Sequence, residues 1–390
     1  MAPEPSLENV NKASPGEPLA LYVHWPFCVS KCPYCDFNSH VRGNVDQDDW
    51  RRALLADLAH EARLLPDRRL GSIFFGGGTP SLMDPATVAA LIEAALSYWP
   101  GSEGIEITLE ANPSSVEAAN FSALASAGVN RVSLGLQSLD PSALAFLGRA
   151  HGVEESFRAL EVAQDRFARV SVDLIYALPG DREDRWSAML DRVLAFGTGH
   201  LSLYQLTIEP GTRFAALHAA GKLDPLGSDE AASLFELTAE RTAMAGLPAY
   251  EISNHSRSGE ESRHNLTYWR YGDYVGIGPG AHGRRTGMRT VRHKKPENFL
   301  AGVARNGHGL SEEAQLTAGE SAAEALVMGL RMREGIDPDA LARRFGRPLI
   351  DEAATSRIAA LGLIERTASS LRLAEPGRLL LDRILAEIAA

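Results

Sequence analysis

Six short apolar segments rich in β-forming residues alternate with helical segments over the first 212 residues, and this alternation limits the possible folds. The segments between them carry apolar residues at helical spacing, for example Trp50, Leu54 and Leu58. Strands that are joined through helices run parallel in one sheet. The six strand-like segments are residues 19–27, 72–80, 105–113, 129–139, 169–180 and 200–212.

Six βα units are too few for a closed barrel of eight and predict an α/β fold with an incomplete (β/α)6 TIM-like barrel. An open doubly wound parallel sheet fits the same alternation and is the alternative architecture. In barrels of this kind, ligands bind at the carboxyl ends of the strands. The predicted strands end in glycines 76–78, Glu110, Gln137, Asp173 and Thr207, so we expect a ligand site at this edge.

All three cysteines of the chain lie within eight positions, directly after the first predicted strand. Cys28, Cys32 and Cys35 have the spacing Cys-x3-Cys-x2-Cys. Residues 1–18 are polar and rich in proline, lack the apolar core of a signal peptide and are expected to be flexible. No apolar run reaches the roughly 18–20 residues that cross a bilayer, so we expect a cytoplasmic protein with free thiols.

Clustered thiols in a reducing compartment point to metal binding or catalysis. Three thiolates can hold three corners of an iron–sulfur cube, which leaves the fourth iron open for a cofactor. Zinc completed by His24 or His40 is the alternative. Structural zinc normally has four ligands, often as two separated pairs, and the sequence has no second pair of cysteines. The spacing therefore favours an iron–sulfur cluster.

The cysteine spacing, with Tyr34 just before the last cysteine, resembles the signature of the radical S-adenosylmethionine superfamily. The resemblance implies a 4Fe-4S cluster whose open iron is chelated by S-adenosylmethionine, which is cleaved when the cluster is reduced. The stretch "GGGTP" resembles the glycine-rich segment that receives the amino group of this cofactor, which implies contacts from Gly77, Gly78 and Thr79. The further cofactor contacts that the resemblance implies are Tyr22, Tyr34, Glu110 as a ribose-binding carboxylate, Gln137, Arg149 and Asp173.

The stretch "YVHWPFCVSKCPYCDFNSH" is similar to the pattern of the HemW haem chaperones, relatives of the oxygen-independent coproporphyrinogen III dehydrogenase. The resemblance implies a protein that binds the cluster, S-adenosylmethionine and haem and delivers haem to haem-dependent proteins. The stretch "HNLTYW" resembles the haem-binding motif of this family, which implies contact of His264 with haem, beside Tyr268 and Trp269. A core histidine beside packing aromatics is the alternative interpretation.

Oxygen-independent coproporphyrinogen III dehydrogenase, which decarboxylates two propionates oxidatively, is the alternative function. The dehydrogenase pattern has an additional cysteine where this chain has Phe37, and a longer segment before its cluster. Both differences favour the chaperone, so we expect no dehydrogenase activity, while radical cleavage of S-adenosylmethionine stays open. The expected partners are haem, haem-accepting proteins such as membrane respiratory enzymes, and a low-potential electron donor such as flavodoxin or ferredoxin.

After about residue 310 the chain becomes rich in Ala, Leu and Arg with helical spacing. Three helices, a hairpin and a last helix predict a small, mainly helical winged-helix-like domain. The expected organisation is a flexible segment at residues 1–18, the partial barrel with the cluster at 19–285, a connecting segment at 286–310 and the C-terminal domain at 311–390.

Charge argues against a nucleic-acid partner. The net charge is −11, and residues 311–390 carry 10 Arg and no Lys against 13 Asp and Glu, whereas nucleic-acid-binding domains are normally basic. A nucleic-acid-modifying radical enzyme is therefore the third and least favoured function. The one basic cluster, residues 284–295, is interpreted as a solvated loop, with contact to porphyrin propionates as the alternative.

Overall fold

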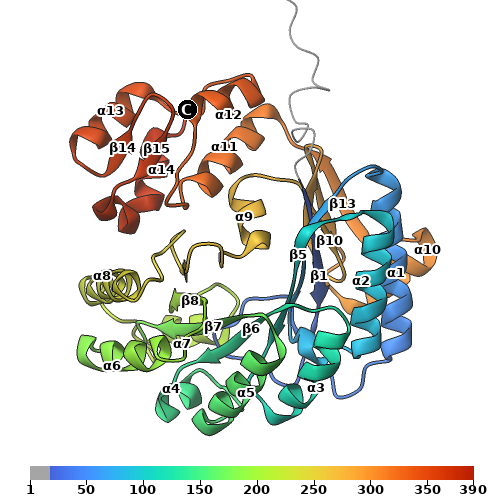
Figure 1. Cartoon of the computed structure of the whole chain (residues 1–390). Coiled ribbons are helices and arrows are strands. Elements are labelled where there is room, and N and C mark those ends of the chain that lie inside the picture. The colour runs from blue at the N-terminus through green and yellow to red at the C-terminus, as the bar shows by residue number, and fades with distance from the viewer. Residues whose placement is uncertain (1–17) are drawn as a thin grey trace, which may run out of the picture.

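The computed structural model describes residues 18–390 (Figure 1), so the segment expected to be flexible lies, apart from Pro18, outside the described residues. Six parallel strands follow one another across the central sheet in chain order. They are β1 (Leu19–Trp25), β4 (Leu70–Gly77), β5 (Gly101–Ala111), β6 (Arg131–Gln137), β7 (Arg169–Tyr176) and β8 (His200–Gln205). This order confirms the incomplete barrel and excludes the doubly wound alternative, in which the strand order reverses.

Helices follow each of the six strands, and most of them pack along one face of the sheet (Figure 1). Several helices begin at an N-cap residue whose side chain accepts hydrogen bonds from backbone amides of the first turn. These N-cap residues are Asp46, Asp84, Ser114 and Asp140. The helices are α1 (Gln47–Leu64), α2 (Pro85–Tyr98), α3 (Ser115–Ser126), α4 (Pro141–Phe146), α5 (Val153–Arg166), α6 (Glu183–Leu194), α7 (Arg213–Ala219) and α8 (Ser228–Met244).

The sheet extends beyond both ends of the six-stranded unit. β9 (Asn254–Ser256) pairs antiparallel with β8, and β10 (Tyr274–Ile277) pairs parallel with β1 on its free edge. β11 (His282–Arg285), β12 (Met288–Arg292) and β13 (Leu310–Gln315) continue the sheet as antiparallel strands. Segment 286–310, predicted as a connection, thus contains β12 and the helix α10 (Pro296–Asn306).

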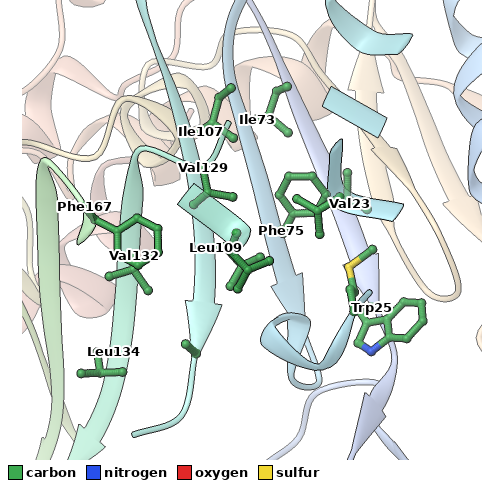
Figure 2. Close-up of a cluster of buried hydrophobic side chains, with 14 of the residues drawn as sticks. Val23, Trp25, Ile73, Phe75, Ile107, Leu109, Val129, Val132, Leu134 and Phe167 are labelled. Atoms are coloured by element: carbon green, nitrogen blue, oxygen red, sulfur yellow. The ribbon is translucent and has the colours of Figure 1, made fainter. Parts of the chain in front are cut away.

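Along each parallel strand, successive side chains point to opposite faces of the sheet, as the two-residue period of a β-strand requires. One set, which includes Val23, Phe75, Leu109 and Val132, forms the main hydrophobic core together with side chains of the helices (Figure 2). The residues between them in the sequence point to the opposite face, into the interior of the barrel. That interior set is mostly polar, and it builds the site described below.

The basic segment 284–295 is not a solvated loop, as the sequence interpretation expected, because most of its arginines are buried and paired. Arg292 is fully buried, and its guanidinium bonds Glu61 over 2.6 Å and Asp57 over 3.3 Å, both carboxylates of α1. Arg285 bonds the other oxygen of Glu61 over 2.6 Å. Burial of these charges is tolerated because each has a partner of opposite charge, and the network ties the added strands to α1.

The C-terminal residues form a separate core with the connectivity of a winged helix. Ile336 bridges Leu371, which adds a third strand position to the small hairpin. The elements are α11 (Ala318–Gly329), α12 (Pro338–Phe345), α13 (Glu352–Ala360), β14 (Ile364–Arg366), β15 (Leu371–Leu373), the 3-10 turn η2 (Glu375–Leu380) and α14 (Leu381–Ile388). This confirms the predicted winged-helix-like arrangement. Within residues 18–390, no helix has both the length and the apolar character that a bilayer crossing needs.

A short helix, α9 (Arg263–Trp269), lies between the barrel and this C-terminal unit (Figure 1). The guanidinium of Arg331 lies 4.7 Å from the centre of the Trp269 ring, and Arg270 bonds Glu334 over 2.8 Å. Just after the helix, the Tyr271 hydroxyl donates a hydrogen bond of 2.9 Å to Glu324. The helix is therefore held by the C-terminal unit along one side.

Candidate functional site

The three cysteines lie on the loop that follows β1, at the carboxyl end of the parallel strands. Cys28 ends the short strand β2 (Phe27–Cys28), which pairs with β3 (His40–Val41). All three thiols are free and half-buried, and burial raises the pKa of Cys28 and of Cys35. The loop is anchored to the barrel where the amide of Phe214 donates to the carbonyl of Pro33 over 3.0 Å.

Two polar side chains from segments that follow two different strands reach the cysteine sulfurs. The Thr79 hydroxyl, after β4, donates to Cys28 Sγ over 3.5 Å. The Arg149 guanidinium, on the chain segment after β6, donates to Cys32 Sγ over 3.6 Å. Tyr34, predicted to belong to the same pocket, is also largely buried beside Arg149, and burial raises the pKa of its hydroxyl. The structure thus brings Tyr34, Thr79 and Arg149 together around the predicted metal ligands.

A cavity of about 180 Å³ occupies the interior of the barrel, and its lining includes residues of α9 but none of the cysteine loop. Four residues that the sequence analysis singled out lie in its wall: Tyr22, Glu110, Asp173 and His264. The rest of the lining is Phe74, Arg131, Ser133, His200, Ser202, Tyr204, Asn265 and Tyr268. The wall is built almost entirely from the inward-facing set of strand residues and from α9, so strand alternation places its polar groups.

Glu110 and Asp173 both line this interior and interact electrostatically. Burial, with the charge of Asp173 as a second cause, raises the pKa of Glu110 to about 8. Burial likewise raises the pKa of Asp173, although Ser133 donates to both of its oxygens, over 3.0 and 2.9 Å. Two close carboxylates in a poorly solvated space favour a proton or a cationic ligand between them.

The glycine-rich turn connects this acidic interior to the cysteine loop. Gly77 has a φ of +112°, a conformation that a side chain rarely adopts, and its amide donates to Glu110 over 3.2 Å. A Cβ atom on Gly78 would lie 2.6 Å from the carbonyl oxygen of Phe27. Both glycines are therefore required for the backbone of β4 to approach β1 and its loop so closely.

Gln137 lies at the end of β6, close to Gly135, whose carbonyl accepts a hydrogen bond of 3.0 Å from Arg149. The φ of Gln137 is +65°, in the left-handed region, and its amide nitrogen approaches Gly135, where a Cβ atom would lie 2.8 Å away. Gln137 is absent from the wall of the interior cavity in the described chain. Its predicted contact with a cofactor therefore stays a prediction.

His264 lies at the other end of the barrel, where α9 covers the amino ends of the strands. Its Nδ1 is hydrogen-bonded to Ser72 over 2.9 Å and its Nε2 to Tyr268 over 2.6 Å. The ring is 1% exposed, and burial lowers its pKa to about 3. Glu106 accepts the amide of His264 over 3.1 Å. In this conformation His264 is a neutral core histidine with both nitrogens occupied.

Sequence reasoning missed part of the site and considered His24 only as a zinc ligand. His24 lies beneath the glycine turn, hydrogen-bonded to Tyr22 and to the carbonyl of Asn38, each over 2.9 Å, and burial lowers its pKa to about 4. The interior serines were missed because only strand ends were considered. The sequence feature that could have identified these serines is the alternation of polar and apolar residues within β6, β7 and β8. This alternation places Ser133, Ser171 and Ser202 on the inner face of the sheet.

The thiols fit an iron–sulfur cluster better than one metal ion. Throughout residues 18–390, no three His, Cys, Asp or Glu side chains form a group that could hold a metal ion. Both ring nitrogens of His24 are engaged in hydrogen bonds, which argues against the zinc alternative through this residue. Thiolates of a cluster stand farther apart, since each binds a different iron. The polar groups near their sulfurs, Thr79 and Arg149, are hydrogen-bond donors of the kind that surrounds such clusters.

Two family models match the chain. The model of the radical SAM superfamily matches residues 22–193, which include the cysteine loop and the first five parallel strands. The model of the HemN C-terminal domain matches residues 316–380, the winged-helix-like unit. Membership in the superfamily implies a 4Fe-4S cluster and S-adenosylmethionine as cofactors.

Relatives resemble the chain over most of its length. The heme chaperone HemW of Escherichia coli (strain K12) is 37% identical over 383 residues, 94% of this chain and 97% of that protein. A mitochondrial protein of Mus musculus, radical S-adenosyl methionine domain-containing protein 1, is 42% identical over 328 residues, 81% of this chain and 74% of that protein. The structure of E. coli coproporphyrinogen III oxidase (HemN), a radical SAM enzyme, shares the fold, with a TM-score of 0.82 at 22% identity over 98% of this chain and 93% of that one. The chain therefore belongs to the radical SAM superfamily and, within it, to the family of HemW haem chaperones.

Proposed function

We propose that this protein holds a 4Fe-4S cluster on Cys28, Cys32 and Cys35, binds S-adenosylmethionine beside it, and delivers haem to haem-dependent proteins in the cytoplasm. The observation that carries the proposal is the position of the thiols: they stand at the carboxyl end of a barrel whose interior offers two carboxylates. Reducing conditions keep such thiols available for iron. The cluster would supply one-electron chemistry, fed by a low-potential donor such as flavodoxin or ferredoxin.

The acidic interior of the barrel, which the glycine-rich turn links to the cysteine loop, suits a cationic nucleoside. We expect Glu110 to accept from ribose hydroxyls, and a positive sulfonium nearby would lower the raised pKa of Glu110 and of Asp173 and so favour their charged forms. The backbone of Gly77, Gly78 and Thr79 lies beside them for the amino group. Tyr22 closes the interior side, with its hydroxyl directed to His24. These residues orient the cofactor and exclude water.

Haem is supported by the HemW relatives and by the motif on α9. The conformation described here does not fit haem at His264, because both ring nitrogens are bonded and the cavity of about 180 Å³ is smaller than the roughly 300–1,000 Å³ of ordinary small-molecule sites. The proposed contact of His264 with haem therefore requires that Nε2 first leaves the Tyr268 hydroxyl. Tyr268 and Trp269 would then present aromatic surface to the porphyrin.

Anaerobic reconstitution tests the cluster. The wild-type protein and the loop variant Val29→Ala, which keeps all three thiols, are expected to bind iron and sulfide in equal amounts and to give the absorbance of a 4Fe-4S cluster. Cys32→Ala is expected to lose the cluster. Iron-free wild-type protein, or zinc in its place, would refute the proposal.

Haem titration of the reconstituted protein tests the proposed binding and delivery of haem. Haem is expected to bind stoichiometrically and to transfer to an apo-haem protein. His264→Ala should weaken binding, whereas Tyr268→Phe, which frees Nε2 and keeps the ring, should strengthen it. Unchanged haem binding in His264→Ala would refute the proposed role of this residue.

An anaerobic assay with S-adenosylmethionine and coproporphyrinogen III tests the alternative function. Release of protoporphyrinogen would overturn the chaperone function in favour of the dehydrogenase.

A further inference from the structure

Asn112 lies between the two side chains that contact cysteine sulfurs. Its Nδ2 donates to the hydroxyl of Thr79 over 3.3 Å, and its Oδ1 accepts a hydrogen bond from the Arg149 guanidinium. Thr79 in turn donates to Cys28 and Arg149 to Cys32. One asparagine thus completes a chain of hydrogen bonds that begins at one cysteine and ends at another.

The position of Asn112 is set by contacts on the rest of the residue. Its backbone amide donates to Glu117 over 2.7 Å, and that buried carboxylate also accepts from Ser81 and Ser114. Asn112 follows β5 directly, so the sheet determines where its side chain points. The amide group is suited to this place because it offers an acceptor and a donor at once. Alanine offers neither, and aspartate offers no donor to Thr79.

We propose that Asn112 is a positioning residue that holds Thr79 and Arg149 against the sulfurs of Cys28 and Cys32 and thereby raises the reduction potential of the cluster. This inference rests on the proposed function, because it requires the cluster on these cysteines. Hydrogen bonds to the sulfurs stabilise the additional negative charge of the reduced cluster, and they are among the factors that set cluster potentials. The positive charge of Arg149 acts in the same direction.

The direct test is the midpoint potential of the reconstituted cluster in Asn112→Ala, followed by EPR during a redox titration. We expect the ratio of reduced to oxidised cluster at the wild-type midpoint to fall about tenfold, which for a one-electron couple is a shift of about 59 mV to lower potential. Asn112→Ser, which is polar but too short to span both partners, is expected to shift in the same direction. This second variant keeps the test valid if the alanine variant does not fold.

Asn130 provides a matched control. Its side chain also makes one accepting and one donating hydrogen bond, with the amide of Ile107 and the carbonyl of Ile105, but it has no link to the cysteines. Asn130→Ala should lower thermal stability and leave the potential unchanged. Equal potentials in wild type, Asn112→Ala and Asn112→Ser, or an equal shift in Asn130→Ala, would overturn the inference.

A double variant tests whether Asn112 acts through Thr79. Thr79→Val removes the hydroxyl and keeps the shape, so the shift caused by Asn112→Ala should be smaller in the Thr79→Val background than in wild type. A full shift in that background would contradict the proposed route. Iron content separates this inference from the proposed function: wild-type protein without a cluster refutes both, whereas a complete cluster with an unshifted potential in the variants refutes only the role of Asn112.

Discussion

Gly77 lies directly against the imidazole of His24: a Cβ atom at Gly77 would be 2.5 Å from Cε1 of that ring. Real Cβ atoms do not approach other atoms so closely, so a side chain at this position would push His24 away from Tyr22 and from the Asn38 carbonyl. The close approach joins β4 to β1 at the end where the cysteine loop begins.

Gly77→Ala is therefore expected to destabilise the protein and to weaken binding of S-adenosylmethionine. The substitution combines the strain of a φ of +112° with the steric conflict at His24. Gly180→Ala is the control, because Gly180 has a φ of +80° but open space around it, so only backbone strain of about 1–2 kcal/mol applies there. Thermal unfolding and isothermal titration of the cofactor measure the difference. Equal losses in the two variants would show that the contact with His24 is unimportant.

Arg292→Ala should be among the most destabilising changes outside the site. The variant leaves the buried carboxylates of Asp57 and Glu61 without their main positive partner, for which a loss of about 3–5 kcal/mol is typical. Arg289→Ala removes a surface pair with Glu312, whose side chains are 50% and 52% exposed, and should cost less than about 1 kcal/mol. Denaturant unfolding distinguishes the two, and a small effect of Arg292→Ala would mean that the network does not hold the added strands to α1.

The stability of the apo-protein should fall with rising pH because of Glu110. The folded-state pKa of about 8 lies above the ordinary value of 4.5, so the folded protein binds this proton more tightly than the unfolded chain. The stabilisation is complete below pH 4.5 and is lost as the pH rises through 8. Glu110→Gln should therefore lose less stability than wild type between about pH 5 and about pH 9. The exposed Glu103→Gln serves as control, and parallel curves for wild type and Glu110→Gln would contradict the assignment.

The part of the site that local sequence patterns predict is the carboxyl end of the barrel. Cys28, Cys32 and Cys35 were predictable because a short loop brings them together whatever the rest of the chain does. Glu110 and Asp173 were predictable because parallel strands end at one edge. Both inferences need only the order of elements along the chain, and the structure and the family comparisons confirm the fold on which they depend.

The parts of the fold and of the site that could not be predicted depend on contacts between residues far apart in the sequence. His264 meets Ser72 across 192 positions, and nothing in the local pattern indicates that α9 returns to the amino end of β4. Arg292 and Glu61 are separated by 231 positions, so a run of basic residues was interpreted as a solvated loop although its charges are paired inside the protein. Asn112 lies two residues after the predicted site residue Glu110, but its two partners, Thr79 and Arg149, come from different βα units.

The placement of α9 has a consequence for any attempt to dissect the molecule. At the start of α9, His264 is buried against the amino end of the barrel and bonds Ser72. At its other end, Trp269 and the adjoining Tyr271 contact side chains that come after residue 320. A truncation that removes the winged-helix-like unit would expose these aromatic side chains to solvent and remove the contacts that hold α9 against the barrel. The barrel and the C-terminal unit should accordingly melt together in a single cooperative transition.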